Sequence, residues 1–140
     1  MKKQLQQLSD FQRIYDQTRN TKPTLIEPDD YYLRYRLGKE ELVEYLDACN
    51  NDDLIEITDA LADQLYILLG TMVAHGMQGI IEDVFNEVHR SNMSKLGEDG
   101  KPIYREDGKV LKGPNFSKPN IEQFLIAGQS QLEIPFDEKV

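Results

Sequence analysis

The sequence predicts an all-α protein, and three observations lead to that prediction. Apolar residues recur at helical spacing across residues 31–49. Residues 65–73 are apolar nearly all round, which is typical of a buried central helix. Between them, residues 50–53 read Asn-Asn-Asp-Asp, and these side chains can accept the free N–H groups at the start of a helix. We therefore expect two long antiparallel helices joined by a short turn.

The remaining helices follow from caps and breakers. Ser9 can cap a first helix, and the proline-containing stretch 21–30 reads as a loop. Gly76 and Gly79 are expected to end the central helix, and another helix follows them. The predicted helices thus occupy about 9–19, 31–49, 53–75 and 80–95.

Residues 97–116 differ in character, because they are rich in glycine and charge. Asp107-Gly108 is a typical hairpin turn and is flanked by short apolar pairs at 103–104 and 110–111. Pro119 fits the first turn of a short last helix that Gly128 would end. We expect one domain over 1–128, with a hairpin insertion at about 100–114, and a C-terminal tail over 129–140.

Composition excludes several classes of protein. The net charge of −9 argues against a nucleic-acid groove. No long apolar run indicates a membrane span, and the N-terminus lacks the apolar region of a secretory signal. A single cysteine rules out an internal disulfide framework, and with two histidines it argues against a structural zinc site. A cytoplasmic protein is the simplest expectation.

Acidic residues gather on the two central helices: residues 40–63 hold nine acids and no lysine or arginine. Residues three or four apart share a helix face, so Glu41 pairs with Glu44. By the same rule Glu56, Asp59 and Asp63 form one stripe on the next helix. Because the helices should be antiparallel neighbours, the two acidic stripes can face each other.

Two interpretations of these stripes are open. They can form an ordinary solvated face, which is common for acidic helices. Alternatively they hold a cation, because facing carboxylates repel one another unless a cation lies between them. Oxygen ligands without histidine or cysteine suit Mg²⁺, with Mn²⁺ possible. Such a metal typically meets a phosphate-bearing substrate.

A basic block follows the acidic one, with seven lysines or arginines against four acids in residues 89–118. These cations can neutralise the phosphates of a substrate, and the glycine-rich hairpin can fold over it as a lid. The same cations also suit an ordinary charged hairpin and a helix C-terminus. The sequence leaves open whether the hairpin is a lid or a contact between subunits.

Two motifs and one long block resemble a known superfamily. The motifs are E-E-L-V-E (40–44) and E-I-T-D (56–59), and the block is EVHRSNMSKLGEDGKPIYREDGKVLKGPNF (87–116). They resemble the all-α nucleoside-triphosphate pyrophosphohydrolases, which include MazG, dimeric dUTPases and phosphoribosyl-ATP pyrophosphohydrolase. The block looks like the branch labelled phosphoribosyl-ATP pyrophosphohydrolase-like, and the resemblance spans roughly residues 28–125.

The resemblance implies a MazG-like four-helix bundle with a small C-terminal β-hairpin and tail, assembled as a homodimer or a dimer of dimers. It implies Mg²⁺-dependent hydrolysis of a nucleotide between its α and β phosphates, which gives a monophosphate and pyrophosphate. The alternative is a catalytically weak module of the same fold that binds a nucleotide, a metal or a partner protein.

The resemblance also implies roles for individual residues. The metal ligands would be Glu41, Glu44, Glu56 and Asp59, and Glu40 would be a ligand or a water-orienting base beside Glu41. The expected catalytic residues are thus Glu40 and Glu41. Contacts to the nucleotide are expected from the basic block and the N-x-x-K match, namely Arg90, Asn92, Lys95 and Lys112.

This chain departs from the family pattern at one point. In many relatives the second-motif Asp precedes two apolar residues and an aromatic, and Asp63 fits that register better than Asp59. That alignment places Ala60 where the second Glu belongs. We therefore keep Asp59 and Asp63 as alternative principal ligands, both on one face.

The tail raises a separate possibility. The stretch QLEIPF resembles the short peptides with which bacterial replication and repair proteins bind the sliding clamp. An extended tail with apolar anchors suits a groove on another protein. The other reading, which we favour, is that these anchors pack on this chain or on a neighbouring subunit. The residues concerned are Gln131, Leu132, Ile134 and Phe136.

Overall fold

A computed structural model describes residues 1–130 of the chain. Among these residues the only β structure is one antiparallel bridge, between Tyr104 and Val110. The all-α prediction is therefore confirmed. The described chain forms two compact units, residues 1–79 and 80–130. The helices are α1 (Lys2–Ile14), α2 (Pro28–Asn50), α3 (Leu54–Ala74), α4 (Ile81–Met93) and α5 (Glu122–Ser130).

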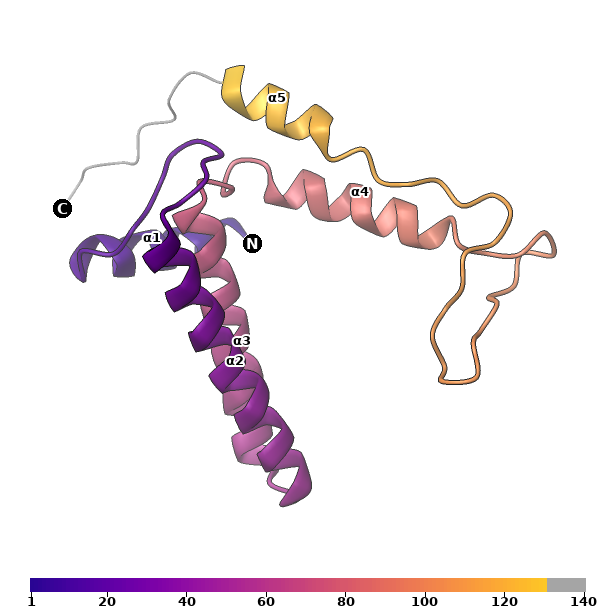
Figure 1. Ribbon diagram of the computed structural model, residues 1–140, viewed down its shortest axis with the longest axis horizontal. Coiled ribbons are helices and arrows are strands. Elements are labelled where there is room, and N and C mark those ends of the chain that lie inside the picture. The colour runs from indigo at the N-terminus through magenta and orange to yellow at the C-terminus, as the bar shows by residue number, and fades with distance from the viewer. Residues whose placement is uncertain (131–140) are drawn as a thin grey trace. The chain divides into compact units, whose positions relative to one another are not determined.

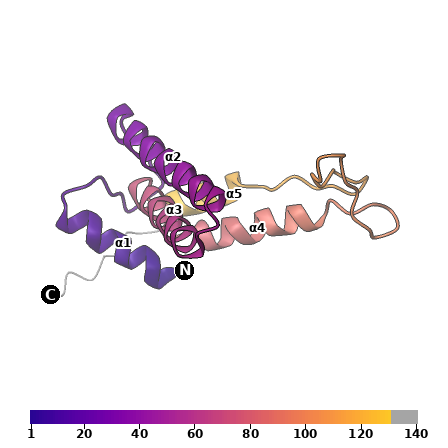
Figure 2. The same ribbon diagram turned by 90° about the horizontal axis from the view of Figure 1, so that it is seen from below.

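The first unit is built around α2 and α3, which lie side by side in both views (Figures 1 and 2). Asp53 caps α3, because its carboxylate accepts the N–H groups of Ile55 and Glu56 at 3.0 and 3.1 Å. Helix α2 begins at Pro28, three residues before the predicted start, since proline is well suited to the first helical turn. The two predicted central helices are thus present.

Helix α1 differs from its prediction. It spans Lys2–Ile14, so Ser9 lies in the middle of the helix and is buried rather than serving as a cap. The cause is a stripe at helical spacing, Leu5, Leu8 and Gln12, which buries one face of α1. Helix α1 contacts α3, where the Gln12 side-chain amide donates to the Gly70 carbonyl at 2.7 Å.

The loop between α1 and α2 is fixed to the C-terminal end of α3. Asn20 donates a side-chain hydrogen bond to the Ala74 carbonyl at 2.6 Å, and the Thr24 N–H donates to the His75 carbonyl at 2.9 Å. Gly76 has φ +71°, and a Cβ there would collide with the Lys22 carbonyl. The predicted stop at Gly76 is therefore explained by a left-handed residue pressed against this loop.

Helix α3 is the most apolar helix of the described chain. By length and composition alone it could cross a membrane. However, α3 contacts both α1 and α2, and a central helix of a helical unit has the same apolar composition. Helix α4 belongs to the second unit, so the predicted four-helix bundle is not confirmed within this chain.

In the second unit the chain after residue 113 returns along α4 (Figure 1). The Ser117 N–H donates to the Ser94 hydroxyl at 2.9 Å. Nearer the start of α4, the Asn120 N–H donates to the Glu87 carboxylate at 2.8 Å. These bonds hold the returning segment extended along the helix.

The glycine-rich loop forms the predicted turn but little β structure. Gly108 has φ +83°, and the Leu111 N–H donates to the Ile103 carbonyl at 2.7 Å. The pairing amounts to a single bridge, so the predicted hairpin is not confirmed as a sheet. The last helix starts at Glu122 rather than near Pro119, because residues 117–120 are held extended on α4. Helix α5 runs to Ser130, so the predicted end at Gly128 was also wrong.

Candidate functional site

Most of the carboxylates predicted from spacing influence Glu41 on α2. Burial raises the pKa of Glu41 above its usual value, and four neighbouring carboxylates raise it further. Their order of influence is Glu44, Asp63, Glu40 and Asp59. We call Glu41 and these four residues the carboxylate patch. Acids on both central helices are therefore near enough to influence the charge of Glu41.

Glu41 is the least exposed member of the patch. Its Oε2 atom is enclosed and has no hydrogen-bond partner. Its backbone carbonyl accepts a hydrogen bond from the Gln64 side chain at 3.2 Å, which ties this turn of α2 to α3. An enclosed, ionised carboxylate oxygen without a donor, among like charges, is unfavourable unless the carboxylate takes up a proton or a cation joins it.

The two alternative principal ligands both belong to the patch. Asp63 has the larger influence on the Glu41 pKa, and Asp59 the smaller. Glu56 lies in the first turn of α3 and is not among the residues that raise this pKa. Within residues 1–130, no three acidic, histidine or cysteine side chains are already grouped as metal ligands. The acids thus influence one another's charge, but their side chains in the described residues do not form a set of metal ligands.

One face of α3 joins the patch to helix α1. Asp59, Asp63, Tyr66 and Gly70 follow one another at spacings of four, three and four residues, so they share this face. Helix α1 contacts the same face, because Gln12 bonds Gly70 and the Phe11 ring meets Tyr66 edge-on with centroids 5.6 Å apart. The carboxylate patch therefore lies on the side of α3 that α1 partly covers.

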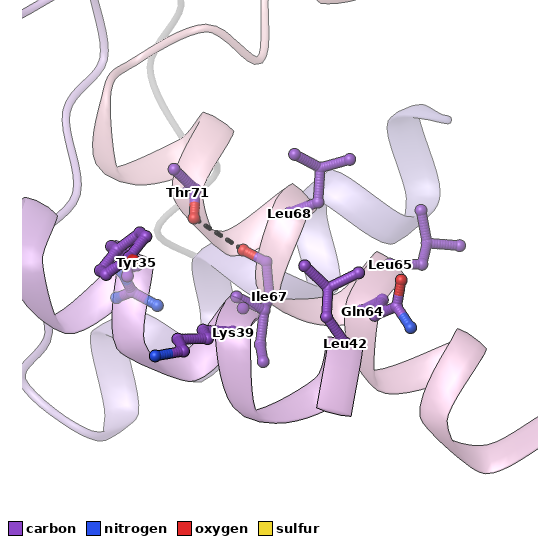
Figure 3. A pocket seen from close by; sticks show the side chains of 10 residues that line it. Tyr35, Lys39, Leu42, Gln64, Leu65, Ile67, Leu68 and Thr71 are labelled. Carbon is purple, nitrogen blue, oxygen red and sulfur yellow. Dashed lines mark hydrogen bonds between the residues drawn. The ribbon is translucent and has the colours of Figure 1, made fainter. Parts of the chain in front are cut away.

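A groove of about 700 Å³ runs between α2 and α3 (Figure 3). Its walls are mainly apolar, with Leu42 from α2 and Leu65 and Leu68 from α3, each more than half exposed. Gln64 lines the groove and directly follows Asp63, so the two side chains differ by about 100° around α3. The groove and the acids of α3 therefore face directions about 100° apart around α3.

The sequence did not reveal the polar contacts that hold the first unit together. Arg34 on α2 is half-buried and donates to the Gln17 side chain at 2.9 Å. Burial lowers the pKa of Arg34, while the nearby Asp30 carboxylate opposes that change. Asp30 itself accepts from the Thr18 hydroxyl at 2.7 Å. No motif predicts these long-range pairs, because each depends on the path of a loop.

Arg90, predicted to bind substrate, has protein partners in the structure. Its guanidinium meets both carboxylate oxygens of Glu87 at 2.8 Å and also donates to the Lys118 carbonyl. These bonds, together with the Asn120 N–H, lower the pKa of Glu87 to about 2. Arg90 and Glu87 thus fix the returning segment on α4, a role that the sequence did not show.

The other predicted nucleotide contacts lie nearby in the sequence. Asn92 is exposed on α4, and the Lys95 carbonyl accepts the Gly113 N–H at 2.9 Å. The Lys112 ammonium lies 4.5 Å from the centre of the Phe116 ring, a cation–π contact. All of these residues belong to the second unit. The proposed clamp-binding residues 131–136 lie outside the described residues.

Comparisons with known proteins point to one family. The model of the phosphoribosyl-ATP pyrophosphohydrolase family matches residues 8–92. A solved structure from Exiguobacterium sp. 255-15, provisionally described as an NTP pyrophosphohydrolase, is 27% identical. The match covers 90% of this chain and 93% of that one, with a TM-score of 0.46. No curated protein matched the sequence. The family match contains the whole carboxylate patch, together with Arg90 and Asn92.

Proposed function

The chain belongs to the phosphoribosyl-ATP pyrophosphohydrolase family, and we propose that it is a magnesium-dependent enzyme of nucleotide hydrolysis. The family is one of nucleotide pyrophosphohydrolases. The proposed substrate is a nucleoside triphosphate or a related nucleotide such as phosphoribosyl-ATP, and the products are the monophosphate and pyrophosphate. The observation that carries this proposal is the enclosed, unpartnered oxygen of Glu41 among four other carboxylates.

The donor chemistry of the patch fits Mg²⁺, with Mn²⁺ as a substitute. All candidate ligands are carboxylate oxygens, which these hard cations prefer. Glu41, Glu44, Asp59 and Asp63 would hold the ion, and Glu56 lies within reach of the same helix face by spacing. A bound Mg²⁺ would neutralise phosphate oxygens and lower the pKa of a bound water.

The remaining roles fall to residues of the chain itself. Glu40 is exposed beside Glu41, and we propose that it takes a proton from the attacking water. Water adds at phosphorus, and the bond between phosphorus and the bridging oxygen of the α,β-anhydride breaks. If water attacks the α phosphorus, pyrophosphate leaves with the bridging oxygen. If water attacks the β phosphorus, the monophosphate leaves with the bridging oxygen and pyrophosphate carries the water oxygen.

We propose different roles for the basic residues of the second unit. Asn92 and Lys95 would contact the phosphates or the sugar. Arg90 and Lys112 are held by Glu87 and Phe116, so they would shape the surface that presents those contacts.

We also propose that the enzyme is a cytoplasmic homodimer, or a dimer of dimers, associated through the groove. Leu42, Leu65 and Leu68 present an apolar surface to water at the groove. A second copy of the chain would cover them.

The first test is pyrophosphate release from nucleoside triphosphates, dUTP and phosphoribosyl-ATP, with Mg²⁺, with Mn²⁺ and with a chelator. We expect metal-dependent release from at least one substrate. Glu41→Gln and Asp63→Asn should each lower kcat/KM by more than about 100-fold, since even residues that only support metal ligands cost 10–100-fold. Asp47→Asn is the matched control, because Asp47 is an exposed acid of α2 outside the patch.

A second candidate is a module that binds a nucleotide or metal without efficient hydrolysis. Two features favour it. The acids are not grouped as metal ligands among the described residues, and in the alignment that makes Asp63 the principal ligand the buried Ala60 stands where the family pattern has a glutamate. Metal-dependent nucleotide binding without pyrophosphate release from any substrate would select this candidate. Normal release by Glu41→Gln would exclude the proposed site.

A further inference from the structure

An aromatic cluster lies where α1 meets α3. The rings of Phe11 and Tyr15 are 4.4 Å apart between centroids, and Phe11 also meets Tyr66 edge-on. Phe11 is half-buried between the other two, whereas Tyr15 is 64% exposed and Tyr66 is 40% exposed. Packing between α1 and α3 explains the position of Phe11. It does not explain why two tyrosines keep so much ring surface in water.

The cluster borders the carboxylate patch. Tyr66 follows Asp59 and Asp63 by seven and three residues, so the three side chains share one face of α3. Helix α1 brings Phe11 onto this face at Tyr66, and Tyr15 follows one turn later, at the end of α1. Exposed ring surface and carboxylates therefore adjoin on the same side of the α2–α3 pair.

We propose that Tyr15 and Tyr66, supported by Phe11, stack on the base of the nucleotide whose phosphates the carboxylate patch receives. This inference rests on the proposed function and names the part of the substrate that the first unit binds. Every nucleobase has a π face, so stacking tolerates purines and pyrimidines alike. No carboxylate or lysine belongs to the cluster itself, so it supplies affinity for a base without reading its charge. The cluster therefore favours nucleotides, whatever their base, over phosphate compounds that have no base.

Tyr15 is the residue to change, because it follows the last residue of α1 and packs only at the surface. Tyr15→Ala removes the exposed ring and leaves the Phe11–Tyr66 contact in place. Tyr15→Phe keeps the ring. Tyr32→Ala is the matched control, because Tyr32 is 57% exposed and lies on α2 beside Tyr31, outside the cluster.

The experiment compares KM for nucleoside triphosphates with the inhibition constant of inorganic pyrophosphate, which has no base. We expect Tyr15→Ala to raise KM about tenfold for purine and pyrimidine substrates alike. Pyrophosphate inhibition should not change. Tyr15→Phe should behave as the wild type, and so should Tyr32→Ala.

Binding of nucleoside monophosphates by calorimetry keeps the two proposals distinguishable. If the protein releases no pyrophosphate from any substrate, weaker nucleotide binding by Tyr15→Ala still supports the stacking role while the proposed hydrolysis fails. The stacking role is wrong if Tyr15→Ala leaves both KM and nucleotide affinity unchanged, or if pyrophosphate affinity falls to the same extent. It is also wrong if the wild-type protein binds no nucleotide.

Discussion

At the scale of single residues, Glu41 is the acid whose pKa responds to carboxylates of both central helices. Spacing on the two helices predicts that Glu41, Glu44, Asp59 and Asp63 lie on neighbouring faces, and the charges of the other three raise the pKa of Glu41. Their role as metal ligands stays a prediction. Spacing could not show that one oxygen of Glu41 is enclosed, because enclosure depends on how α2 and α3 pack. For the same reason spacing could not show that Asp63 influences the pKa of Glu41 more than Asp59 does.

The raised pKa of Glu41 predicts how stability depends on pH in metal-free protein. Since the folded-state pKa lies above the unfolded value, the stabilising contribution is present below the unfolded pKa and is lost as pH rises through the folded pKa. We expect the melting temperature of Glu41→Gln to exceed that of the wild type at pH 7, and to lose this part of the pH dependence. Equal melting temperatures for the two proteins from pH 4 to 8 would contradict the prediction.

Mg²⁺ should offset the loss of stability that the charged Glu41 causes in the wild type at neutral pH. A ligand present at 100 times its Kd stabilises the folded state by about 2.7 kcal/mol. We therefore expect Mg²⁺ to raise the melting temperature of the wild type and of Asp47→Asn at pH 7, and to have little effect on Glu41→Gln. An undiminished Mg²⁺ shift in Glu41→Gln would place the ion elsewhere.

At the scale of elements, helix ends depended on contacts that a local pattern does not contain. The cap at Asp53 and the stop at Gly76 were predictable, because each is made by residues beside the helix. Ser9 was misread as a cap because α1 buries it against the rest of the first unit. Pro119 was misread as a helix start because the neighbouring Asn120 bonds a distant residue, Glu87.

Gly76 offers a sharp test of how α3 ends. Gly76→Ala adds a methyl group that collides with the Lys22 carbonyl, at a residue with left-handed φ. The conformation alone costs about 1–2 kcal/mol, so we expect the free energy of unfolding to fall by at least about 2 kcal/mol. Gly79→Ala is the matched control, since a Cβ there has no neighbour within 4 Å. Urea unfolding that ranks the two variants equally would refute this account.

The bond between Glu87 and the returning segment should respond to acid. The pKa of Glu87 is lowered to about 2, so its stabilising contribution is present above its ordinary value near 4.5 and is lost as pH falls toward 2. We expect Glu87→Gln to speed hydrogen exchange of the Asn120 amide at pH 7, whereas Glu106→Gln in the exposed loop should not. Exchange that is unchanged in Glu87→Gln would show that other contacts hold the segment.

At the scale of the whole molecule, the predicted bundle was larger than the structure of one chain supports. Periodicity identified the apolar faces of α2 and α3, but not whether another helix of the chain or a second chain covers them. In the described residues α1 contacts α3, and an apolar groove between α2 and α3 stays uncovered. A sequence pattern identifies the apolar face of a helix but not the helix or chain that packs on it. For this reason the four-helix arrangement could not be derived from the sequence.

The proposed association through the groove predicts a specific dissociating change. Leu68→Glu places a charge where a second copy would bury it, and an unpaired buried charge is strongly unfavourable. We expect the dimer dissociation constant to rise more than about tenfold. Leu25→Glu is the matched control, since Leu25 is 94% exposed in the loop between α1 and α2. Analytical ultracentrifugation that shows a wild-type monomer, or an intact Leu68→Glu dimer, would rule out this interface.

The enclosed oxygen of Glu41 has a consequence for the lifetime of the protein in a cell. Proteases remove chains mainly while they are unfolded, so the cost of an enclosed, charged Glu41 oxygen, which a bound cation would relieve at neutral pH, would also affect how fast the protein is degraded. If the proposed site holds magnesium, a cell starved of that ion would lose the enzyme itself as well as its activity. The amount of protein would then follow the ion supply without any regulator of its gene.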